Sequence, residues 1–456
     1  MDGLPTPRRH LAVLAISCGT ALNVIDGAIP NVALPTIARD LGIGPSAAVL
    51  IVSVYQLVLV MTLLPFSALG TRIGLRRLYQ CGQCVFIVAA LLCFFAPNLP
   101  LLLAARTLQA LGAAAALSVS SALVRSIYPA SQLGRGLGIN SVVVASSAAL
   151  APILGGFIVA IASWPWVFAA TIPLGLASVI AGQRSLPDTP VRREPYNLTA
   201  ALLCALTFGL TISGLLALAQ GQAPATALPV VILGALVAVV FTRRELREAS
   251  PILPVDLLAR PILALSILGA FLAFIGSMTF LLSVPFRLQH HFGFSPGEIG
   301  AAIAPWPLAM MIVAPIAGAL SDRFHAGLLG GIGMAIATAG MLLLAFMPEG
   351  LAHGSIAWRM SVCGVGYGMF LSPNARLVVS AAPLARAASA GGLISTNRLV
   401  AQALGATLVA GLLNLGHGSD STPAFIGAAL TLCAGICSVA RLAMLGAPAP
   451  VEERQV

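Results

Sequence analysis

Residues 67–72, Ser-Ala-Leu-Gly-Thr-Arg, return in similar form as residues 318–323, Gly-Ala-Leu-Ser-Asp-Arg, at an offset of 251 positions. Arg106 has a counterpart in Arg359 at an offset of 253 positions. A nearly constant offset between matching stretches indicates that one segment was duplicated. The chain is therefore predicted to consist of two homologous halves.

The composition indicates a membrane protein. Of the 456 residues, 59% are hydrophobic and only 8% are charged, whereas a soluble domain carries about 25% charged residues. So few charged side chains are too few to cover a surface in water, while a lipid bilayer requires no such cover. We therefore expect a chain whose main partner is the lipid bilayer.

We predict an all-α integral membrane fold with fourteen spanning helices. Each crossing needs about 20 mainly apolar residues. Arg8 and Arg9 precede an apolar run that continues past Asp26, so we expect a retained first helix rather than a cleaved signal peptide. The predicted spans are 11–36, 47–69, 78–95, 99–123, 137–161, 164–183, 197–219, 225–242, 261–285, 299–320, 326–347, 353–376, 388–412 and 422–444.

The arginines predict the orientation of these spans. All 24 basic residues are arginines, scattered between apolar runs, so the net charge of +10 reflects membrane topology rather than nucleic-acid binding. With the N-terminus in the cytoplasm, nineteen arginines fall on the cytoplasmic side and only Arg39 and Arg287 on the other. Arg106, Arg359 and Arg398 fall within spans. This asymmetry favours an even number of crossings, with both termini cytoplasmic.

The repeat predicts three regions. Residues 1–183 form an N-terminal six-helix bundle, and residues 261–456 form a C-terminal six-helix bundle with a short cytoplasmic tail. Residues 184–260 form a linker with two extra transmembrane helices. Paired repeats with a binding site between them at the middle of the membrane are typical of secondary transporters.

Asp26 is the candidate proton carrier. Of the 14 acidic residues, it alone lies deep within a predicted span. An aspartate at that depth costs about 2.5–3.5 kcal/mol on insertion scales, and burial favours its neutral form. Arg106, also within a span, is the candidate partner that tunes Asp26 or relays its proton. The alternative is structural: Asp26 only bonds neighbouring helices or balances Arg106.

Polar and aromatic residues within the spans are candidates for the substrate cavity. Aromatic rings attract lipophilic cations, although such rings more often face lipid or a neighbouring helix. The six histidines and eight cysteines form no metal-ligand cluster, so we expect no metal, no cofactor and no catalytic residues. We expect a monomer. The candidate cavity residues are Asn31, Tyr55, Gln109, Phe274, Tyr367, Asn397 and Arg398.

Four motifs, in order along the chain, resemble those of a known family. Residues 25–35 (Ile-Asp-Gly-Ala-Ile-Pro-Asn-Val-Ala-Leu-Pro) resemble a first-helix signature, L-D-x-T-I-V-N-V-A-L-P. The chain therefore resembles the fourteen-helix drug:proton antiporter family of the major facilitator superfamily, which includes exporters of quaternary ammonium compounds. The other three motifs are Arg106-x-x-Gln109-x-x-Gly112, residues 151–156 with Pro152, Gly155 and Gly156 (close to G-P-x-x-G-G), and residues 395–398, Ser-Thr-Asn-Arg.

The loop after the second predicted helix departs from the family pattern, G-x-L-A-D-R-x-G-R-R. Arg72, Gly74 and Arg76 are present, but Thr71 replaces the aspartate. The second half keeps its version as Asp322-Arg323. The resemblance implies that these residues govern the conformational change. The threonine then predicts a weaker or one-sided contact between the bundles.

The resemblance implies a proton-coupled transporter, not an enzyme, in the bacterial inner membrane, which exports lipophilic, cationic compounds by alternating access. One proton exchanged for one monovalent cation would move no net charge. Three intramembrane arginines against one aspartate leave open an anionic or natural metabolite as the substrate. Loss of the loop aspartate leaves open a transporter-like receptor that no longer cycles.

Overall fold

Most of the described residues lie in helices, and none of them forms a strand. The computed structural model describes residues 3–129, 132–189, 197–248, 253–321, 323–347, 353–382 and 387–445. The first half comprises α1 (Thr6–Asp40), α2 (Pro45–Ile73), α3 (Leu75–Phe94), α4 (Leu99–Ile127), α5 (Leu133–Ile161), α6 (Trp166–Ala169) and α7 (Ile172–Ser185). The middle comprises α8 (Leu198–Ala219), α9 (Pro224–Glu245) and a 3-10 helix, η2 (Val255–Ala259). The second half comprises α10 (Pro261–Phe292), α11 (Pro296–Ile303), α12 (Pro305–Leu320), α13 (Ala326–Ala345), α14 (His353–Ala381), α15 (Ala387–Asn414) and α16 (Thr422–Leu445).

Twelve helical stretches in the described part of the chain are long and apolar enough to cross a membrane. Two of these stretches are each built from two helices, α6 with α7 and α11 with α12. The second break falls at Ala304, directly before Pro305, whose ring nitrogen has no proton to donate to the helix. α14 and α15, with 29 and 28 residues, have the length but are not among the twelve. The all-α multi-pass fold is confirmed, and the count of fourteen spans stays a prediction.

The outer surface of the bundle is apolar, as a lipid-facing surface must be. On α9, the side chains of Ile232, Leu236 and Val240 are each more than half exposed, at 58%, 59% and 55%. Soluble monomers rarely expose such continuous apolar stripes. The bilayer therefore supplies the contacts that these side chains lack within the chain.

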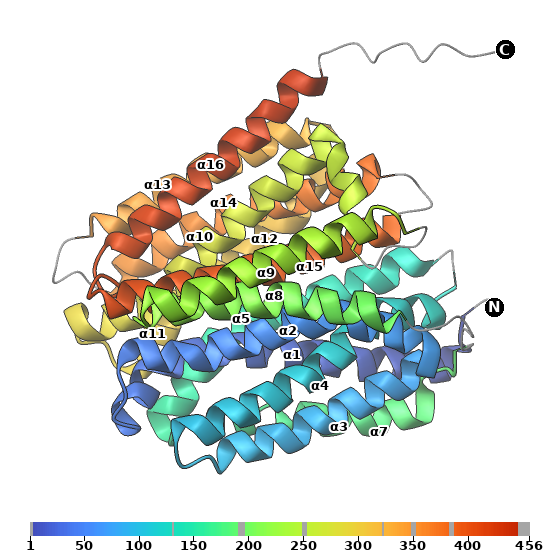
Figure 1. The fold of residues 1–456 in the computed structure, drawn as a ribbon, viewed down its shortest axis with the longest axis horizontal. Coiled ribbons are helices and arrows are strands. Elements are labelled where there is room, and N and C mark those ends of the chain that lie inside the picture. Colours follow the sequence, from blue (N-terminus) through green and yellow to red (C-terminus); the bar gives the residue numbers. More distant parts are fainter. Residues whose placement is uncertain are drawn as a thin grey trace.

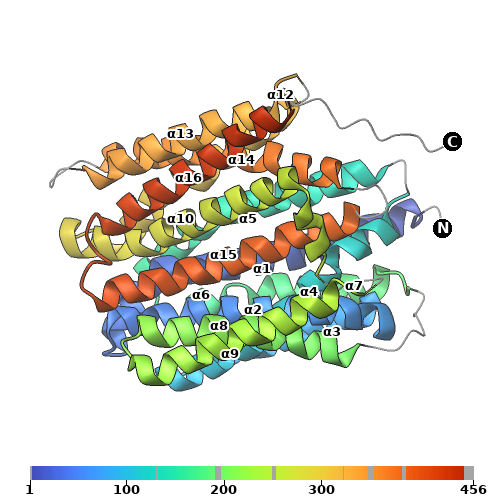
Figure 2. The same ribbon diagram turned by 45° about the horizontal axis from the view of Figure 1, so that its top comes forward.

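The helices form two groups of roughly parallel rods, α1–α7 and α10–α16, that lie side by side (Figure 1). The pair α8 and α9 lies against both groups, and α8 packs on α2 of the first and on α15 of the second (Figure 2). α1 begins and α16 ends at the same end of the molecule (Figure 1). The domain boundaries expected at residues 183 and 260 stay a prediction.

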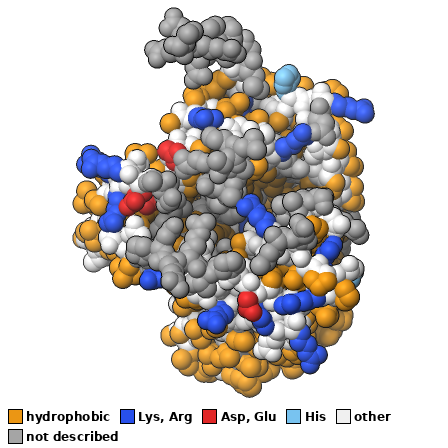
Figure 3. Space-filling view, turned by 90° about the vertical axis from the view of Figure 1, so that its right-hand side faces the viewer, with side chains coloured by type: hydrophobic (Ala, Val, Ile, Leu, Met, Phe, Trp, Pro, Cys, Tyr) orange, Lys and Arg blue, Asp and Glu red, His pale blue; other side chains and the backbone are white. Residues whose placement is uncertain are grey.

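The two groups pack together at the end opposite to the start of α1. Ile29 of α1 and Leu282 and Phe286 of α10 belong to one buried apolar cluster. Nearby, the Ser46 hydroxyl at the start of α2 donates to the carbonyl oxygen of Ala410 on α15, at 2.8 Å. Figure 3 faces the other end, where a recess separates the groups and arginine prevails among the charged side chains in view. The structure is thus closed at one end and open at the other.

Glycines set how closely α3 and α4 approach. A Cβ atom added to Gly82 would lie 2.7 Å from the carbonyl oxygen of Gly112, and one added to Gly112 would lie 2.6 Å from the amide nitrogen of Phe86. Both distances are shorter than real Cβ atoms show, and both partners are backbone atoms. Any larger residue must therefore push the two helices apart.

We expect Gly82→Ala to destabilise the protein by about 1–3 kcal/mol, because the added methyl group overpacks this crossing. The matched control is Gly391→Ala on α15, where an added Cβ meets nothing within 4 Å. The midpoint of thermal unfolding in detergent should fall for the first variant and not for the second. Equal midpoints for the two variants would contradict the close approach of α3 and α4.

Candidate functional site

Asp26 of α1 lies in a buried ion pair with Arg106 of α4. Each side chain is 1% exposed, and Arg106 Nη1 donates to Asp26 Oδ2 at 2.9 Å. Gln109, three residues after Arg106 and so on the same face of α4, completes the group. It accepts from Arg106 Nη1 at 2.7 Å and donates through Nε2 to Asp26 Oδ1 at 2.9 Å. Both carboxylate oxygens of Asp26 therefore have a partner.

Aromatic rings cover the guanidinium of Arg106. Its Cζ atom lies 4.2 Å from the ring centre of Tyr55 on α2 and 5.4 Å from that of Phe168 on α6. Arg106 Nε also donates to the carbonyl oxygen of Ile51 on α2, at 3.4 Å. The Tyr55 phenol lies beside the Asp26 carboxylate, but its hydroxyl makes no hydrogen bond of normal geometry with the described residues. The ring of Tyr55 thus holds Arg106 and does not line an open cavity.

The second half contains a cavity of about 130 Å³ between α10, α14 and α15. Two of the predicted cavity residues, Phe274 and Asn397, line it. Asn397 Nδ2 donates to the carbonyl oxygen of Ile267, at 3.1 Å. Most of the remaining wall is aliphatic, so the cavity offers an apolar lining with amide groups at Asn374 and Asn397.

Two other predicted cavity residues lie elsewhere. Tyr367 is 1% exposed, packs against Trp306 with ring centres 5.1 Å apart, and donates its hydroxyl to the carbonyl oxygen of Ala273 at 2.9 Å. It therefore belongs to the core of the second half. Asn31 lies on α1, and its buried Oδ1 finds no hydrogen-bond partner among the described residues. Arg398, directly after Asn397, is half-buried.

A family comparison decides what kind of protein carries these features. The family model of the Major Facilitator Superfamily matches residues 16–406. The chain belongs to the major facilitator superfamily. It is accordingly a multi-pass membrane transporter and not an enzyme.

The names of relatives within the superfamily state different functions. The chain is 44% identical over 415 residues to the uncharacterized transporter YebQ of Escherichia coli (strain K12), covering 91% of each chain. It is 27% identical over 400 residues to the riboflavin transporter RibZ of Clostridioides difficile, covering 87% of each. It is 30% identical over 379 residues to the methyl viologen resistance protein SmvA of Salmonella typhimurium, covering 81% of this chain and 75% of the relative.

A solved structure shows the same fold. A POT family transporter in complex with 5-aminolevulinic acid superposes with a TM-score of 0.72 at 16% identity, covering 96% of each chain. At that identity the likeness supports the fold of this superfamily member and no more.

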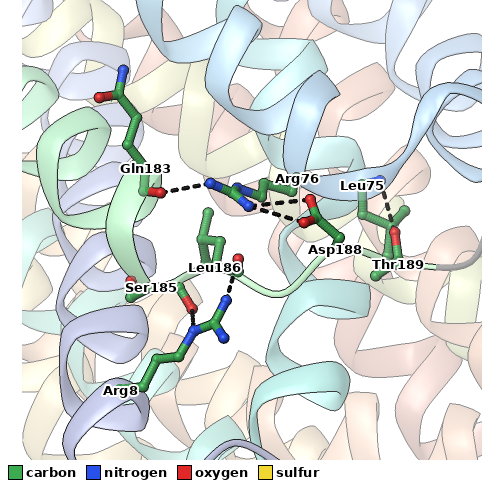
Figure 4. Close-up of polar contacts among 8 residues, drawn as sticks. All are labelled: Arg8, Leu75, Arg76, Gln183, Ser185, Leu186, Asp188 and Thr189. Carbon is green, nitrogen blue, oxygen red and sulfur yellow. Dashed lines mark hydrogen bonds and ion pairs between the residues drawn. The ribbon is translucent and has the colours of Figure 1, made fainter.

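In this transporter, Arg76 binds the segment that follows α7 in its own half (Figure 4). Its Nη1 lies 3.1 Å from Asp188 Oδ1, and its Nη2 donates to the carbonyl oxygen of Gln183 at 2.5 Å. Arg8 Nε donates to the carbonyl oxygen of Ser185 at 3.0 Å. Because the Asp188 side chain is 80% exposed, its ion pair contributes about 0–1 kcal/mol at most. These contacts position the segment more than they stabilise the bundle.

The other residues of the loop motif have separate surroundings. Thr71 donates its hydroxyl to a carbonyl of its own helix, at 2.8 Å, so it makes the local bond of a surface threonine. Gly74 ends α2 with a φ of 99°, in the region that favours glycine. Arg72 and Arg323 are exposed, and Asp322 lies outside the described residues.

The helix 5 motif lies between the two halves. A Cβ added to Gly155 would lie 3.0 Å from the carbonyl oxygen of Ile29 on α1. One added to Gly156 would lie 2.7 Å from the carbonyl oxygen of Pro296 on α11. Pro152 lies within α5, one turn earlier. These small residues let α5 touch both halves at once.

Sequence reasoning missed two side chains of this region. Phe168 lies near the membrane boundary in the predicted helix, so nothing in its spacing indicated that it covers Arg106. Arg441 was counted among the cytoplasmic arginines, but the structure buries it within α16 at 1% exposure. Its position inside the predicted span 422–444 was the signal that could have found it.

We expect Arg106→Gln to destabilise the transporter strongly at alkaline pH, because it leaves the buried Asp26 carboxylate without its cation. Breaking a buried pair costs about 3–5 kcal/mol. The loss should shrink at mildly acidic pH, since protonation of Asp26 removes the unpaired charge. Unfolding midpoints in detergent at the two pH values measure this difference.

The matched variant is the double substitution Asp26→Asn with Arg106→Gln, which removes both charges. It should be more stable at alkaline pH than Arg106→Gln alone. Arg76→Gln, which removes an arginine from an exposed pair, should change the midpoint little. A double variant no more stable than the single one would contradict the coupling between Asp26 and Arg106.

Proposed function

We propose that this transporter exports lipophilic small molecules in exchange for protons, with the Asp26–Arg106–Gln109 group as the proton-coupling unit. The supporting observation is the burial of Asp26: its carboxylate is 1% exposed and held by one charged and one neutral donor. A carboxylate that takes up a proton here changes from a charged acceptor into a neutral group. The ion pair with Arg106 is then lost, and the guanidinium must find other partners.

The same group is connected to the contact between the halves. Ile29, whose carbonyl oxygen faces Gly155 of α5, follows Asp26 by one turn of α1. α5 in turn touches α11 through Gly156. A shift of α1 on protonation would therefore act directly on the closed end. In alternating access, the closed end opens as the recess at the other end closes.

We further propose fourteen spans, made of two six-helix bundles, residues 1–183 and 261–456, and a linker, residues 184–260, that contributes α8 and α9. α14 and α15 carry Asn374 and Asn397, which line the cavity and make these two helices less apolar than a typical span. We propose a monomer as the transporting unit.

For the orientation, we propose a bacterial inner membrane with both termini in the cytoplasm. The end of the molecule at which α1 begins presents mainly arginine among its charged side chains in view (Figure 3). Positively charged loops favour the cytoplasmic side. The recess would then face the cytoplasm, from which an exporter takes its substrate.

Two classes of substrate, which differ in charge, are candidates. The family resemblance favours cations, and one relative is a methyl viologen resistance protein. The Asp26 carboxylate, however, is occupied by Arg106 and Gln109, so it offers a cation no free negative charge in this conformation. That observation favours the second candidate, a substrate that is neutral or acidic.

Dye efflux tests the proposed function. In energised cells that lack their own pumps, the native protein should export ethidium or Nile red, and Asp26→Asn should reduce the rate at least about tenfold, because the proton site is lost. The matched control is Asp40→Asn, which removes an exposed acid from the end of the same helix and should leave efflux intact.

Ionophores separate the driving forces. Nigericin, which collapses the pH gradient, should stop efflux. Valinomycin should leave ethidium efflux in place, because one proton exchanged for one monovalent cation moves no net charge. Efflux that is unchanged in Asp26→Asn would place proton coupling elsewhere. A well-expressed native protein that moves neither dye would refute export of such compounds.

A further inference from the structure

The helices around the cavity of the second half carry positive charge and no negative charge. α10, α14, α15 and α16 contain no aspartate or glutamate at any position. Arg398 and Arg441, on α15 and α16, both lie within the bundle. The first half differs, because its buried arginine is balanced by Asp26.

Arg441 is fully buried among neutral partners. Its Nη1 donates to the Ser266 hydroxyl at 2.8 Å and to Asn374 Oδ1 at 2.5 Å, and its Nη2 donates to the Ser438 hydroxyl at 2.5 Å. These bonds satisfy the guanidinium as a donor but leave its charge uncompensated. Asn374 also lines the cavity, so one amide separates the buried charge from the open space.

Arg398 is the second positive charge. It follows Ile394 by one turn of α15, and Ile394 and Asn397 line the cavity, whereas Arg398 itself lies just outside that lining. It makes no hydrogen bond or ion pair with any described residue, although it lies about 17 Å along α15 from the first residue of that helix. Arg398 as a whole is half-buried, and its guanidinium nitrogens are not among the buried atoms that lack a partner, so they are reachable from open space. An arginine at this depth without a partner is a group that a ligand can satisfy.

We propose that this cavity binds the carboxylate end of a lipophilic organic acid, with Arg398 as the direct partner. Arg441 adds a positive potential behind the cavity wall, where low polarity strengthens the attraction, and the Asn374 amide lies between Arg441 and the cavity. Ile267, Phe274 and Leu371 contact the apolar part of the acid. A cavity of about 130 Å³ is smaller than the roughly 300–1,000 Å³ of a site that encloses a whole drug-sized molecule. It therefore takes one portion of the substrate.

This assignment rests on the proposed export function and names the substrate class. It also separates two tasks: the proton is handled in the first half by Asp26, and the acidic group is bound in the second half by Arg398. Binding can therefore be measured at equilibrium, with no pH gradient and no transport. Its result is independent of whether Asp26 couples export to protons.

The test uses three ligands of nearly equal shape and different charge: naphthaleneacetate, naphthaleneacetamide and naphthylethylammonium. Titration calorimetry on the full chain in nanodiscs should show that the acetate binds about tenfold or more tightly than the amide, because a charged partner strengthens the hydrogen bond to Arg398. Arg398→Gln should abolish that preference, and Arg398→Lys should keep most of it. Since Arg398 contacts no described partner, its replacement removes no structural bond.

Arg359→Gln is the matched control, because it removes another intramembrane arginine whose guanidinium bonds to Ser355 on its own helix. It should leave the preference for the acetate unchanged. Equal binding of the acetate and the amide, tighter binding of the ammonium ligand, no binding of the acetate, or a preference that survives Arg398→Gln would each overturn the proposal. Loss of dye efflux in a protein that still prefers the acetate would instead count against the export function alone.

Discussion

The buried ion pair between Asp26 and Arg106 is the constraint around which the first half is built. Two opposite charges that are each 1% exposed are tolerated only when their remaining bonding groups also have partners. Gln109 supplies one such partner, the carbonyl oxygen of Ile51 another, and the rings of Tyr55 and Phe168 cover the cation. Four helices, α1, α2, α4 and α6, thereby hold one group of atoms. A change in the charge of Asp26 would therefore alter the contacts of all four helices.

The ion pair lies on α1 close to the contact between the two halves, so a change in the pair can affect that contact. One turn further along the same helix, Ile29 meets Gly155, and the adjacent Gly156 meets the start of α11. The closed end of the molecule thus begins next to the buried carboxylate of Asp26. The loop motif after α2 makes no comparable connection, because Arg76 is bound to Asp188 in its own half and Thr71 to its own helix. Among the described residues, the halves meet through α5 and the apolar cluster.

Sequence patterns predicted the helices well, because hydropathy and length are local properties. The expected spans 197–219 and 353–376 correspond to α8, Leu198–Ala219, and to α14, His353–Ala381. The importance of Asp26 could also be inferred, since an acid within an apolar run stands out. The partners of the buried side chains could not be inferred from the sequence. Packing between helices far apart in the chain decides that Phe168 covers Arg106, that Tyr367 packs in the core and that Asn374 binds Arg441. Local patterns carry no information about those contacts.

The two halves carry similar sequence motifs but differ in charge, and this difference has a consequence for transport. In the first half an acid and a base neutralise each other, so proton uptake by Asp26 changes the local charge from balanced to positive. The second half is positive from the start, with Arg398 and Arg441 and no acid on α10, α14, α15 or α16. A protonated first half facing an empty second half would place like charges on both sides of the central space. An acidic ligand next to Arg398 removes that repulsion. With charge alone, the acid and the proton would favour the same arrangement of the halves, so the proposed antiport requires that Asp26 release its proton before the acid binds. The free energy for export then comes from the proton gradient, because binding and release of the acid supply no net free energy over a complete cycle.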